Sequence, residues 1–204
     1  MAITERGNVK EKILASARDL FVREGYEAVS MRKIAAAIDY TAMALYRHFA
    51  DKDSLLRELC LEDFRTLRQA MDRIAFECDP IRRLHMTGLV YVDFALKFPN
   101  QYRLLFLTPL PREVHVEQVM VEHPEVDCYA RLRQMVAEGI LAGRYRKGLD
   151  EEMISQLVWA ALHGIVSLHI LMKRASAIEW KPVAETAEAM LNALLEGLVV
   201  HEKS

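Results

Sequence analysis

The segment from Ser30 to Phe49, SMRKIAAAIDYTAMALYRHF, limits the fold more than any other stretch of the chain. Ser30 and Thr41 each precede a short stretch with apolar residues at helical spacing, and a side-chain hydroxyl there can cap a helix. The segment therefore predicts two short helices, the second from Ala42 to Phe49, joined by a tight turn. Such a pair is either a helix-turn-helix, which lays its second helix in the DNA major groove, or an ordinary helical hairpin. The side chains predicted to be buried are Ile34, Ala35, Ile38, Leu45 and Phe49.

The composition predicts an all-α fold. The chain has 204 residues, of which 52% are hydrophobic and 27% charged, so it can bury a substantial core. Helix-forming Ala, Leu, Glu, Arg and Met are abundant, whereas only 8 residues are Gly and 6 are Pro. We expect an N-terminal three-helix domain over residues 1–50, which contains the helix-turn-helix, and a larger helical domain over residues 51–204.

Caps and breakers divide the rest of the chain into helices. A first helix from Asn8 to Gly25 supplies the floor on which the helix-turn-helix packs, and Asp51 caps a long helix that ends before Pro80. The helix from Pro80 to Phe98 is apolar on nearly every face after its first turn, a pattern typical of a central core helix. The remaining predicted helices cover residues 101–107, 114–121, 124–143 and 151–173, with a last one that opens at Pro182.

Charge is distributed unevenly along the chain. The net charge is −2, yet residues 1–57 carry ten Lys and Arg against eight Asp and Glu. This head therefore carries +2, which leaves −4 for the remainder. A mildly basic head on an acidic body is consistent with nucleic-acid binding at one end only.

The three cysteines, Cys60, Cys78 and Cys128, show no metal-ligand spacing. An odd number of scattered cysteines is typical of a reducing compartment, where the thiols are either small apolar fillers or parts of a redox sensor. The N-terminus lacks the apolar region of a signal peptide, and we expect no uncharged stretch of transmembrane length. We expect no metal or cofactor, whereas a cytoplasmic location follows only from the family resemblance described below.

The last two predicted helices have broad apolar faces. A terminal helix with such a face needs a partner, which is either the rest of the monomer or the same helices of a second copy. Docking on a second copy gives a four-helix interface and a homodimer. Because two-fold symmetry also supplies two half-sites to a helix-turn-helix, we expect dimerisation through these helices and a palindromic double-stranded DNA operator.

The stretch from Ile13 to Leu56 resembles the N-terminal domain of TetR-type transcriptional regulators. The resemblance is carried by ILASARDLFVREGYEAVSMRKIAAA and then by LYRHFADKDSLL, which is close to the family's Leu-Tyr-x-x-Phe followed by a Lys and a Leu-rich helix. In the body, residues 159–164 look like the Trp-x-x-x-His-Gly signature of one C-terminal subgroup, and residues 100–106 resemble its companion segment. The resemblance implies a dimeric repressor that a small, largely apolar ligand releases from its operator.

Position and resemblance together assign DNA contacts in the head. Ala42, Met43 and Arg47 are candidates for the groove, because apolar groups touch thymine methyls and Arg reads guanine. The other assigned residues are expected at or near the phosphate backbone, where Lys52 also gains from the N–H groups of a helix N-terminus. Alternatively, Tyr46 is half core and Arg47 a solvated charge. The residues predicted to bind DNA are Arg32, Lys33, Thr41, Ala42, Met43, Tyr46, Arg47, His48 and Lys52.

Two residues depart from the family's pattern. Asp39 stands where Gly is usual in the turn, at a position that commonly needs a left-handed backbone, which Gly adopts freely and Asp tolerates at some cost. Met43 stands where Gly or another small residue is usual, which puts its direct contact with a base in question.

The resemblance also implies an effector pocket in the body, mainly apolar with a few polar groups. The alternative is a packed core filled by the same side chains. A ligand that prefers one spacing of the two heads must change the DNA affinity by linkage, and the long helix after Asp51 is the expected lever. The residues assigned to the ligand are Met86, Val90, Asp93, Phe94, Tyr102, Phe106, Tyr129, Met135, Trp159 and His163.

Two other classes of protein compete with this reading. An enzyme could use His163, Asp93, Ser167 and Tyr102, although no nucleophile elbow, metal motif or phosphate loop supports it. The other is a helical interaction module that binds no DNA.

Overall fold

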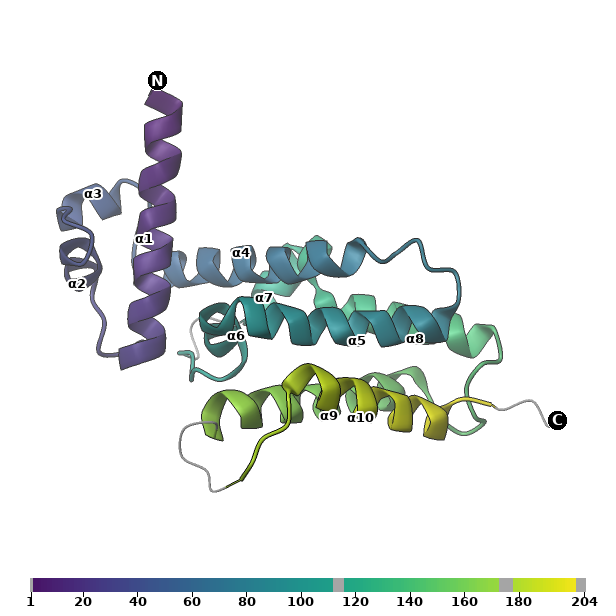
Figure 1. Ribbon diagram of the computed structural model, residues 1–204. Coiled ribbons are helices and arrows are strands. Elements are labelled where there is room, and N and C mark those ends of the chain that lie inside the picture. Colours follow the sequence, from purple (N-terminus) through teal and green to yellow (C-terminus); the bar gives the residue numbers. More distant parts are fainter. Residues whose placement is uncertain (1, 112–115, 173–177, 201–204) are drawn as a thin grey trace. The chain divides into compact units, whose positions relative to one another are not determined.

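Helices make up the regular structure of residues 2–111, 116–172 and 178–200, which are the residues described by the computed structural model (Figure 1). The strand-like pairing within these ranges is an isolated antiparallel bridge between Tyr145 and Val199. The predicted all-α fold, with an N-terminal helix-turn-helix and a larger C-terminal helical domain, is confirmed.

The chain divides into two compact units, one of residues 1–65 and 100–126 and the other of residues 66–99 and 127–204. The boundary predicted after residue 50 divides the chain by expected function, whereas these two units are defined by their internal contacts. The predicted boundary therefore stays a prediction. The first unit contains α1 (Ala2–Glu24), α2 (Met31–Ala36), α3 (Ala42–Tyr46), the start of α4 (Lys52–Asp72), nearly all of α6 (Pro99–Phe106), α7 (Val116–Glu122) and the 3-10 turn η1 (Pro124–Val126). The second contains the end of α4, α5 (Pro80–Lys97), α8 (Cys128–Leu141), α9 (Glu151–Met172) and α10 (Val183–Leu198).

Several helix ends differ from the predicted ones. Helix α1 begins at Ala2 rather than Asn8, and α3 ends at Tyr46 rather than Phe49. The predicted helix over residues 124–143 is interrupted at Asp127, whose carboxylate accepts from the Ala130 N–H and so caps a new helix, α8. Residues 114 and 115 of one predicted helix and residue 173 of another lie outside the described residues.

Helix α1 forms the floor of the first unit. Its apolar stripe of Ile13, Leu14, Ala17 and Phe21 is buried, as are Ile34 of α2 and Leu45 of α3. Gly25 ends α1 with φ +81°, which is the left-handed C-terminal cap expected from the sequence. Burial of this stripe allows the two short helices to be stable, because they could not bury enough surface on their own.

A buried carboxylate joins three helices of the first unit. Asp63 of α4 is fully buried and accepts from Arg18 Nε at 3.0 Å and Nη2 at 2.6 Å. Gln101 Nε2 of α6 donates to the same carboxylate at 2.8 Å. Burial raises the pKa of Asp63, and the bonds from Arg18 and Gln101 act against that rise.

Helix α5 is the centre of the second unit, where it packs against α8, α9 and α10 (Figure 1). Gly88 allows this close packing, because a Cβ there would lie 2.8 Å from Leu191 Cδ1 and 3.0 Å from Leu162 Cδ1. Its place among these three helices is that of the predicted central core helix, but they do not cover all of its faces. Asp93 and Leu96 are exposed, since three packed helices leave one face of α5 open.

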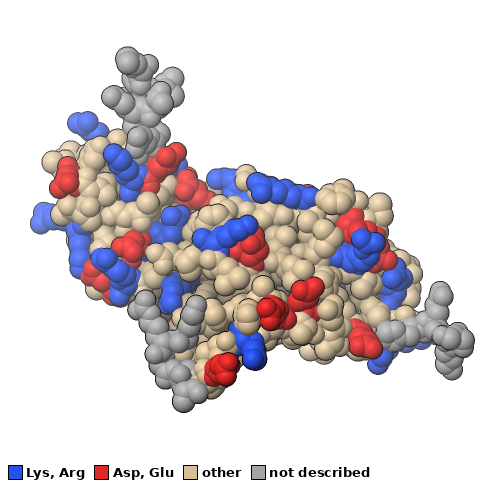
Figure 2. Space-filling view, in the orientation of Figure 1, with Lys and Arg blue, Asp and Glu red and all other residues tan. Residues whose placement is uncertain are grey.

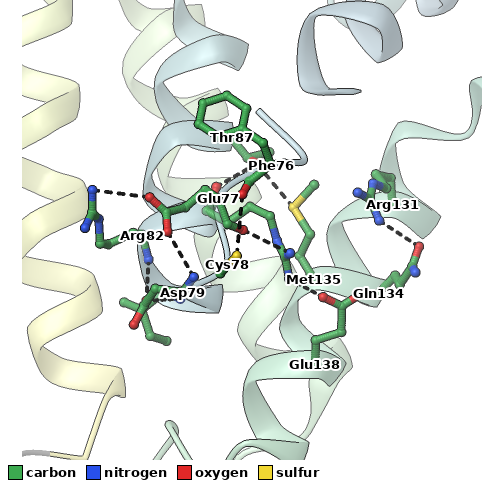
Figure 3. Close-up of polar contacts among 12 residues, drawn as sticks. Phe76, Glu77, Cys78, Asp79, Arg82, Thr87, Arg131, Gln134, Met135 and Glu138 are labelled. Atoms are coloured by element: carbon green, nitrogen blue, oxygen red, sulfur yellow. Dashed lines mark hydrogen bonds and ion pairs between the residues drawn. The ribbon is translucent and has the colours of Figure 1, made fainter. Parts of the chain in front are cut away.

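The connection between α4 and α5 is held by polar contacts at the start of α5 (Figure 3). Helix α4 ends at Asp72, earlier than the prediction, which placed its end just before Pro80. The Asp79 carboxylate caps α5 by accepting from the N–H groups of Ile81 and Arg82, both at 2.9 Å. Arg83 donates to the Glu77 carbonyl at 3.2 Å and forms an ion pair with Glu138 of α8. These contacts fix the chain just before α5.

Helix α9 corrects a prediction about membranes. By length and composition it could cross a membrane, because residues 153–172 contain no Asp, Glu, Lys or Arg. The expectation that no uncharged stretch reaches this length is therefore wrong. Ile154, Val158, Leu162 and Val166 of α9 are buried in the second unit, as in a core helix.

Candidate nucleic-acid interface

The turn between α2 and α3 is built around Asp39. Ser30 caps α2, since its hydroxyl accepts from the Lys33 N–H at 3.2 Å. Asp39 has φ +58°, which confirms the left-handed backbone predicted at this position. The Tyr40 N–H reaches the Ala35 carbonyl at 2.9 Å across this turn, a bond of the Schellman type that satisfies an otherwise orphaned helix carbonyl. The turn thus keeps the geometry that Gly usually supplies.

Helix α3 buries Leu45 and presents its other large side chains to solvent. Thr41 caps it by accepting from the Ala44 N–H at 3.3 Å, as predicted. Met43 is 68% exposed and Tyr46 51% exposed, and Arg47 is exposed as well. An exposure of 51% also fits the alternative that Tyr46 is half core. The helix offers two apolar surfaces and one cation at the place where a recognition helix would meet base edges.

The predicted backbone contacts differ in their surroundings. Arg32 lies exposed on α2, and neither Arg32 nor Arg47 forms an ion pair with another described residue. Lys33 pairs with Glu24 at the end of α1. Ala42 and His48 are half-buried.

Lys52 is the predicted phosphate contact with the most internal partners. Its Nζ donates to the carbonyls of Tyr26 and Val29 at 2.9 and 3.0 Å. It also lies 3.8 Å from the centroid of the Tyr26 ring, a cation–π distance.

On the face drawn in Figure 2, the surface charge does not form an unbroken basic patch. Figure 2 shows Lys and Arg interspersed with Asp and Glu on the face that it draws. In the head, Asp51 and Asp53 flank Lys52 in sequence. Affinity for a polyanion would therefore depend on a few placed cations rather than on a general positive field.

The residues predicted to bind an effector are divided between the two units. Asp93 is exposed and pairs with Lys97 at 2.8 Å, because it lies on the open face of α5 rather than among the apolar side chains. Tyr102 and Phe106 belong to the first unit, where the Phe106 ring lies 6.0 Å from that of Phe64. In the second unit Met86 and Val90 are half-buried, whereas Phe94 and Met135 are buried.

The structure does bring Tyr129, Trp159 and His163 together, around a residue that the sequence prediction missed. The hydroxyl of Tyr91 lies 3.2 Å from His163 Nδ1 and 3.4 Å from Trp159 Nε1, and the Trp159 ring lies 5.5 Å from that of Tyr129. An indole nitrogen only donates, so the Tyr91 oxygen accepts from Trp159 and its proton is available to His163. Burial lowers the pKa of His163, which favours the neutral imidazole that can accept this bond.

One sequence signal could have identified Tyr91, since it is the one residue of α5 with an aromatic ring and a hydroxyl. Trp159 and His163 are one helical turn apart and face it together, which accounts for the spacing of Trp-x-x-x-His in this chain.

Two of the three cysteine thiols are poorly suited to redox sensing. Burial raises the pKa of Cys60 and of Cys128 to about 12, so both thiols stay protonated at neutral pH. Cys78 is exposed, and its thiol lies 3.6 Å from the Phe76 carbonyl (Figure 3).

Two family descriptions match this chain. Residues 13–59 match "Bacterial regulatory proteins, tetR family", and residues 84–195 match "Tetracyclin repressor-like, C-terminal domain". The first match contains α2, α3 and their turn. The second contains Tyr91, Tyr129, Trp159 and His163, which are called the Tyr91 cluster below.

Individual proteins agree with these matches over nearly the full chain. The HTH-type transcriptional regulator UidR of Escherichia coli (strain K12) is 24% identical over 203 residues, 96% of this chain and 95% of that protein. A bacterial regulatory protein in the tetR family from Rhodococcus RHA1 has a TM-score of 0.72 at 22% identity, covering 95% and 98% of the two chains. The regulator FadR of Bacillus subtilis, solved in complex with stearoyl-CoA, has a TM-score of 0.76 at 18% identity, covering 94% and 99%. At these identities the structural likeness shows the fold.

Proposed function

The chain belongs to the TetR family of bacterial regulatory proteins, and from that premise we propose that it is a dimeric repressor released from its operator by a small, largely apolar ligand. Like the relatives that it matches, it is a DNA-binding transcriptional regulator and not an enzyme. The proposal adds the dimer, the ligand and the direction of regulation.

The exposed side chains of α3 are the main support for the proposal that the protein recognises a DNA sequence. Met43, Tyr46 and Arg47 project from a helix capped by Thr41 and held on its other side by Leu45. Around them, Arg32, Lys33, Thr41, Ala42, His48 and Lys52 supply the remaining proposed contacts. Phosphate contacts give affinity and register, whereas side chains on base edges give sequence preference.

A second copy of the chain is the proposed partner of α9 and α10. Met153, Leu157, Leu168 and Leu171 of α9 are large apolar side chains that the protomer leaves exposed. Gly164 has open space where its side chain would be, so another helix could approach the backbone there. Pairing of these faces would bury them in a four-helix interface and place two heads on a palindromic operator.

An acyl thioester is a reasonable first ligand to test, because FadR of Bacillus subtilis was solved with stearoyl-CoA. In this chain the Tyr91 cluster would supply polar groups beside the apolar side chains of α5 and α9. Ligand binding would favour a protomer arrangement with lower operator affinity. The expected site of action is the cytoplasm, where the operator DNA lies.

Selection from random duplex DNA tests the proposed function. The purified full chain should enrich a palindromic sequence, and footprinting should find that sequence upstream of the regulator's own gene. Binding should fall steeply with salt because it depends on phosphate contacts. Failure to enrich any sequence from the random pool would reject the repressor proposal.

A further inference from the structure

Two tyrosines of the helix-turn-helix hold hydroxyl groups that no other described residue binds. Of the 7 tyrosines in the chain, Tyr40 and Tyr46 are the exposed ones, at 36% and 51%. Neither hydroxyl takes part in a hydrogen bond within the described residues, whereas the buried Tyr26 donates to Asp53. A phenol that lies in water without an internal partner can donate its proton to another molecule.

The same two tyrosines belong to an apolar patch on the head. Within residues 9–65, the exposed large hydrophobic side chains are Tyr40, Met43 and Tyr46, which fall within a single short stretch of the chain. Exposed apolar side chains that gather in one place mark an interaction surface. Tyr40 therefore shares the surface of the predicted recognition residues, although the sequence prediction did not include it.

The turn holds Tyr40 directly before α3. Its N–H donates to the Ala35 carbonyl at 2.9 Å, and the next residue, Thr41, caps the helix. The backbone of Tyr40 is thus fixed on both sides, so its side chain leaves the turn from a set point. In a helix-turn-helix the first helix crosses the phosphate backbone and the start of the second reaches base edges. A residue between the two helices therefore lies at the edge of the groove.

Helix α3 is short compared with the groove that it would enter. Its 5 residues span about 7.5 Å at 1.5 Å per residue, whereas the major groove is about 12 Å wide. Contacts with both walls of the groove must therefore come from long side chains at the two ends of the helix. Tyr40 stands just before the start of α3, and Tyr46 is its last residue.

The donor at the start of α3 is neutral, which suits its surroundings. Asp39 is exposed beside Tyr40, and its carboxylate would repel a phosphate that came close to the turn. Tyrosine carries its O–H at the far end of a rigid ring, which keeps the donor away from the backbone of the turn. A hydrogen bond from a hydroxyl to an ionised oxygen is stronger than one between neutral groups.

From this geometry we infer that Tyr40 is a further DNA contact, whose hydroxyl donates to a backbone phosphate at the edge of the major groove. Tyr46 meets the opposite wall, so the two hydroxyls hold α3 between the two strands. This inference rests on the proposed DNA binding and adds a residue to it.

The test removes single hydroxyls from the full chain. Tyr40→Phe keeps the ring and its apolar area. Tyr145→Phe is the matched control, because the Tyr145 hydroxyl is buried in the second unit without a hydrogen-bond partner. Fluorescence anisotropy measures affinity for a duplex selected by the wild-type protein, over a range of salt concentrations. Further duplexes carry an uncharged methylphosphonate in place of one phosphate, at the same position of both half-sites, and each position is tested in turn.

If the inference is correct, Tyr40→Phe binds the unmodified duplex about tenfold more weakly for each half-site, since it loses a hydrogen bond to a charged group. The salt slope should not change, because no cation is removed. At one phosphate position the methylphosphonate should abolish the difference between Tyr40→Phe and the wild-type protein. Tyr145→Phe should bind every duplex as the wild-type protein does, and both variants should keep the wild-type midpoint of thermal unfolding.

Equal binding of the unmodified duplex by Tyr40→Phe and the wild-type protein overturns the inference and leaves the proposed function standing. A difference that persists at every methylphosphonate position also overturns it, because the hydroxyl would then act on a base or within the protein. A lower unfolding midpoint for Tyr40→Phe overturns it by giving the hydroxyl a structural role. If the wild-type protein selects no duplex, the proposed function fails and the inference fails with it.

Discussion

Met43 is the most exposed large side chain of α3, and it carries no charge and no strong hydrogen-bonding group. Such a side chain gains energy from a base mainly by covering apolar surface, and the C5 methyl of thymine is the apolar group of the major groove. The left-handed turn at Asp39 is followed by α3, which begins at Ala42. Met43 therefore lies in the first turn of α3, and the N-terminal residues of recognition helices contact base edges.

Replacing thymine by uracil in the selected duplex tests this contact, since the two bases differ only by that methyl group. With one position changed in each half-site, the wild-type protein should bind the uracil duplex about fifteenfold more weakly, because each of the two buried methyl groups contributes about 0.8 kcal/mol. Met43→Ala should bind both duplexes equally in fluorescence anisotropy titrations. A Met43→Ala protein that still prefers thymine at that position would show that another residue reads the methyl.

The Arg18–Asp63 pair gives a second prediction for single residues. Arg18→Met leaves a fully buried carboxylate without its cation, which should lower the free energy of unfolding by about 3 kcal/mol in urea titrations. Arg18→Met with Asp63→Leu should recover most of this loss, because no charge then remains buried. Arg23→Met is the matched control on the same helix, and its exposed pair with Asp19 should contribute less than about 0.5 kcal/mol. Equal losses for the two single variants would contradict the importance of burial.

Helices were predictable from the sequence where local chemistry sets them. Ser30, Thr41 and Asp51 cap helices as expected, because a cap depends on residues three positions apart. The end of α4 at Asp72 was missed because the first helix breaker after it in the sequence is Pro80. The position of Asp93 was missed for a different reason. Periodicity shows that α5 is apolar, but only the packed structure shows which face stays open.

The same limit applies to the candidate site. Exposure of Met43 and Tyr46 followed from a helix that buries only Leu45, so the DNA-reading face could be predicted from spacing. The internal partners of Lys52 could not, because Tyr26 and Val29 lie more than 20 residues away in the chain. Tyr91 was missed because its hydroxyl gains meaning only beside Trp159 and His163 of a distant helix.

The exposed face of α9 gives a prediction about a single helix. Leu168→Glu places a charge on a side chain that is 50% exposed in the protomer, so the fold should persist in circular dichroism spectra. In the dimer this charge would be buried without a partner, and the dimer dissociation constant should rise at least about tenfold in sedimentation experiments. Leu141→Glu, at a site that is 88% exposed at the end of α8, is the matched control and should leave the dimer intact. A dimer that tolerates Leu168→Glu would place the interface elsewhere.

For the whole molecule, the proposed release from the operator would be a coupling free energy between the DNA site and the ligand site, and such coupling is reciprocal. If a ligand such as stearoyl-CoA weakens operator binding by a given factor, saturating operator DNA must weaken ligand binding by the same factor. Calorimetric titration of the ligand into free and DNA-bound protein measures this, and a coupling of about 1–3 kcal/mol is expected, a factor of about 5–150. Equal ligand affinities in the two titrations would show that this ligand is not an inducer.

The uncharged length of α9 has a consequence for the protein during its synthesis. Under the proposed pairing, a newly made protomer would expose Met153, Leu157, Leu168 and Leu171 until it met a second copy, and exposed apolar surface of this kind favours aggregation. Under the proposed pairing, the cellular amount of regulator has a lower limit set by the dimer dissociation constant. Below that limit chaperones and proteases, rather than the operator, would take up the chain, so the abundance of this regulator would be coupled to its own assembly.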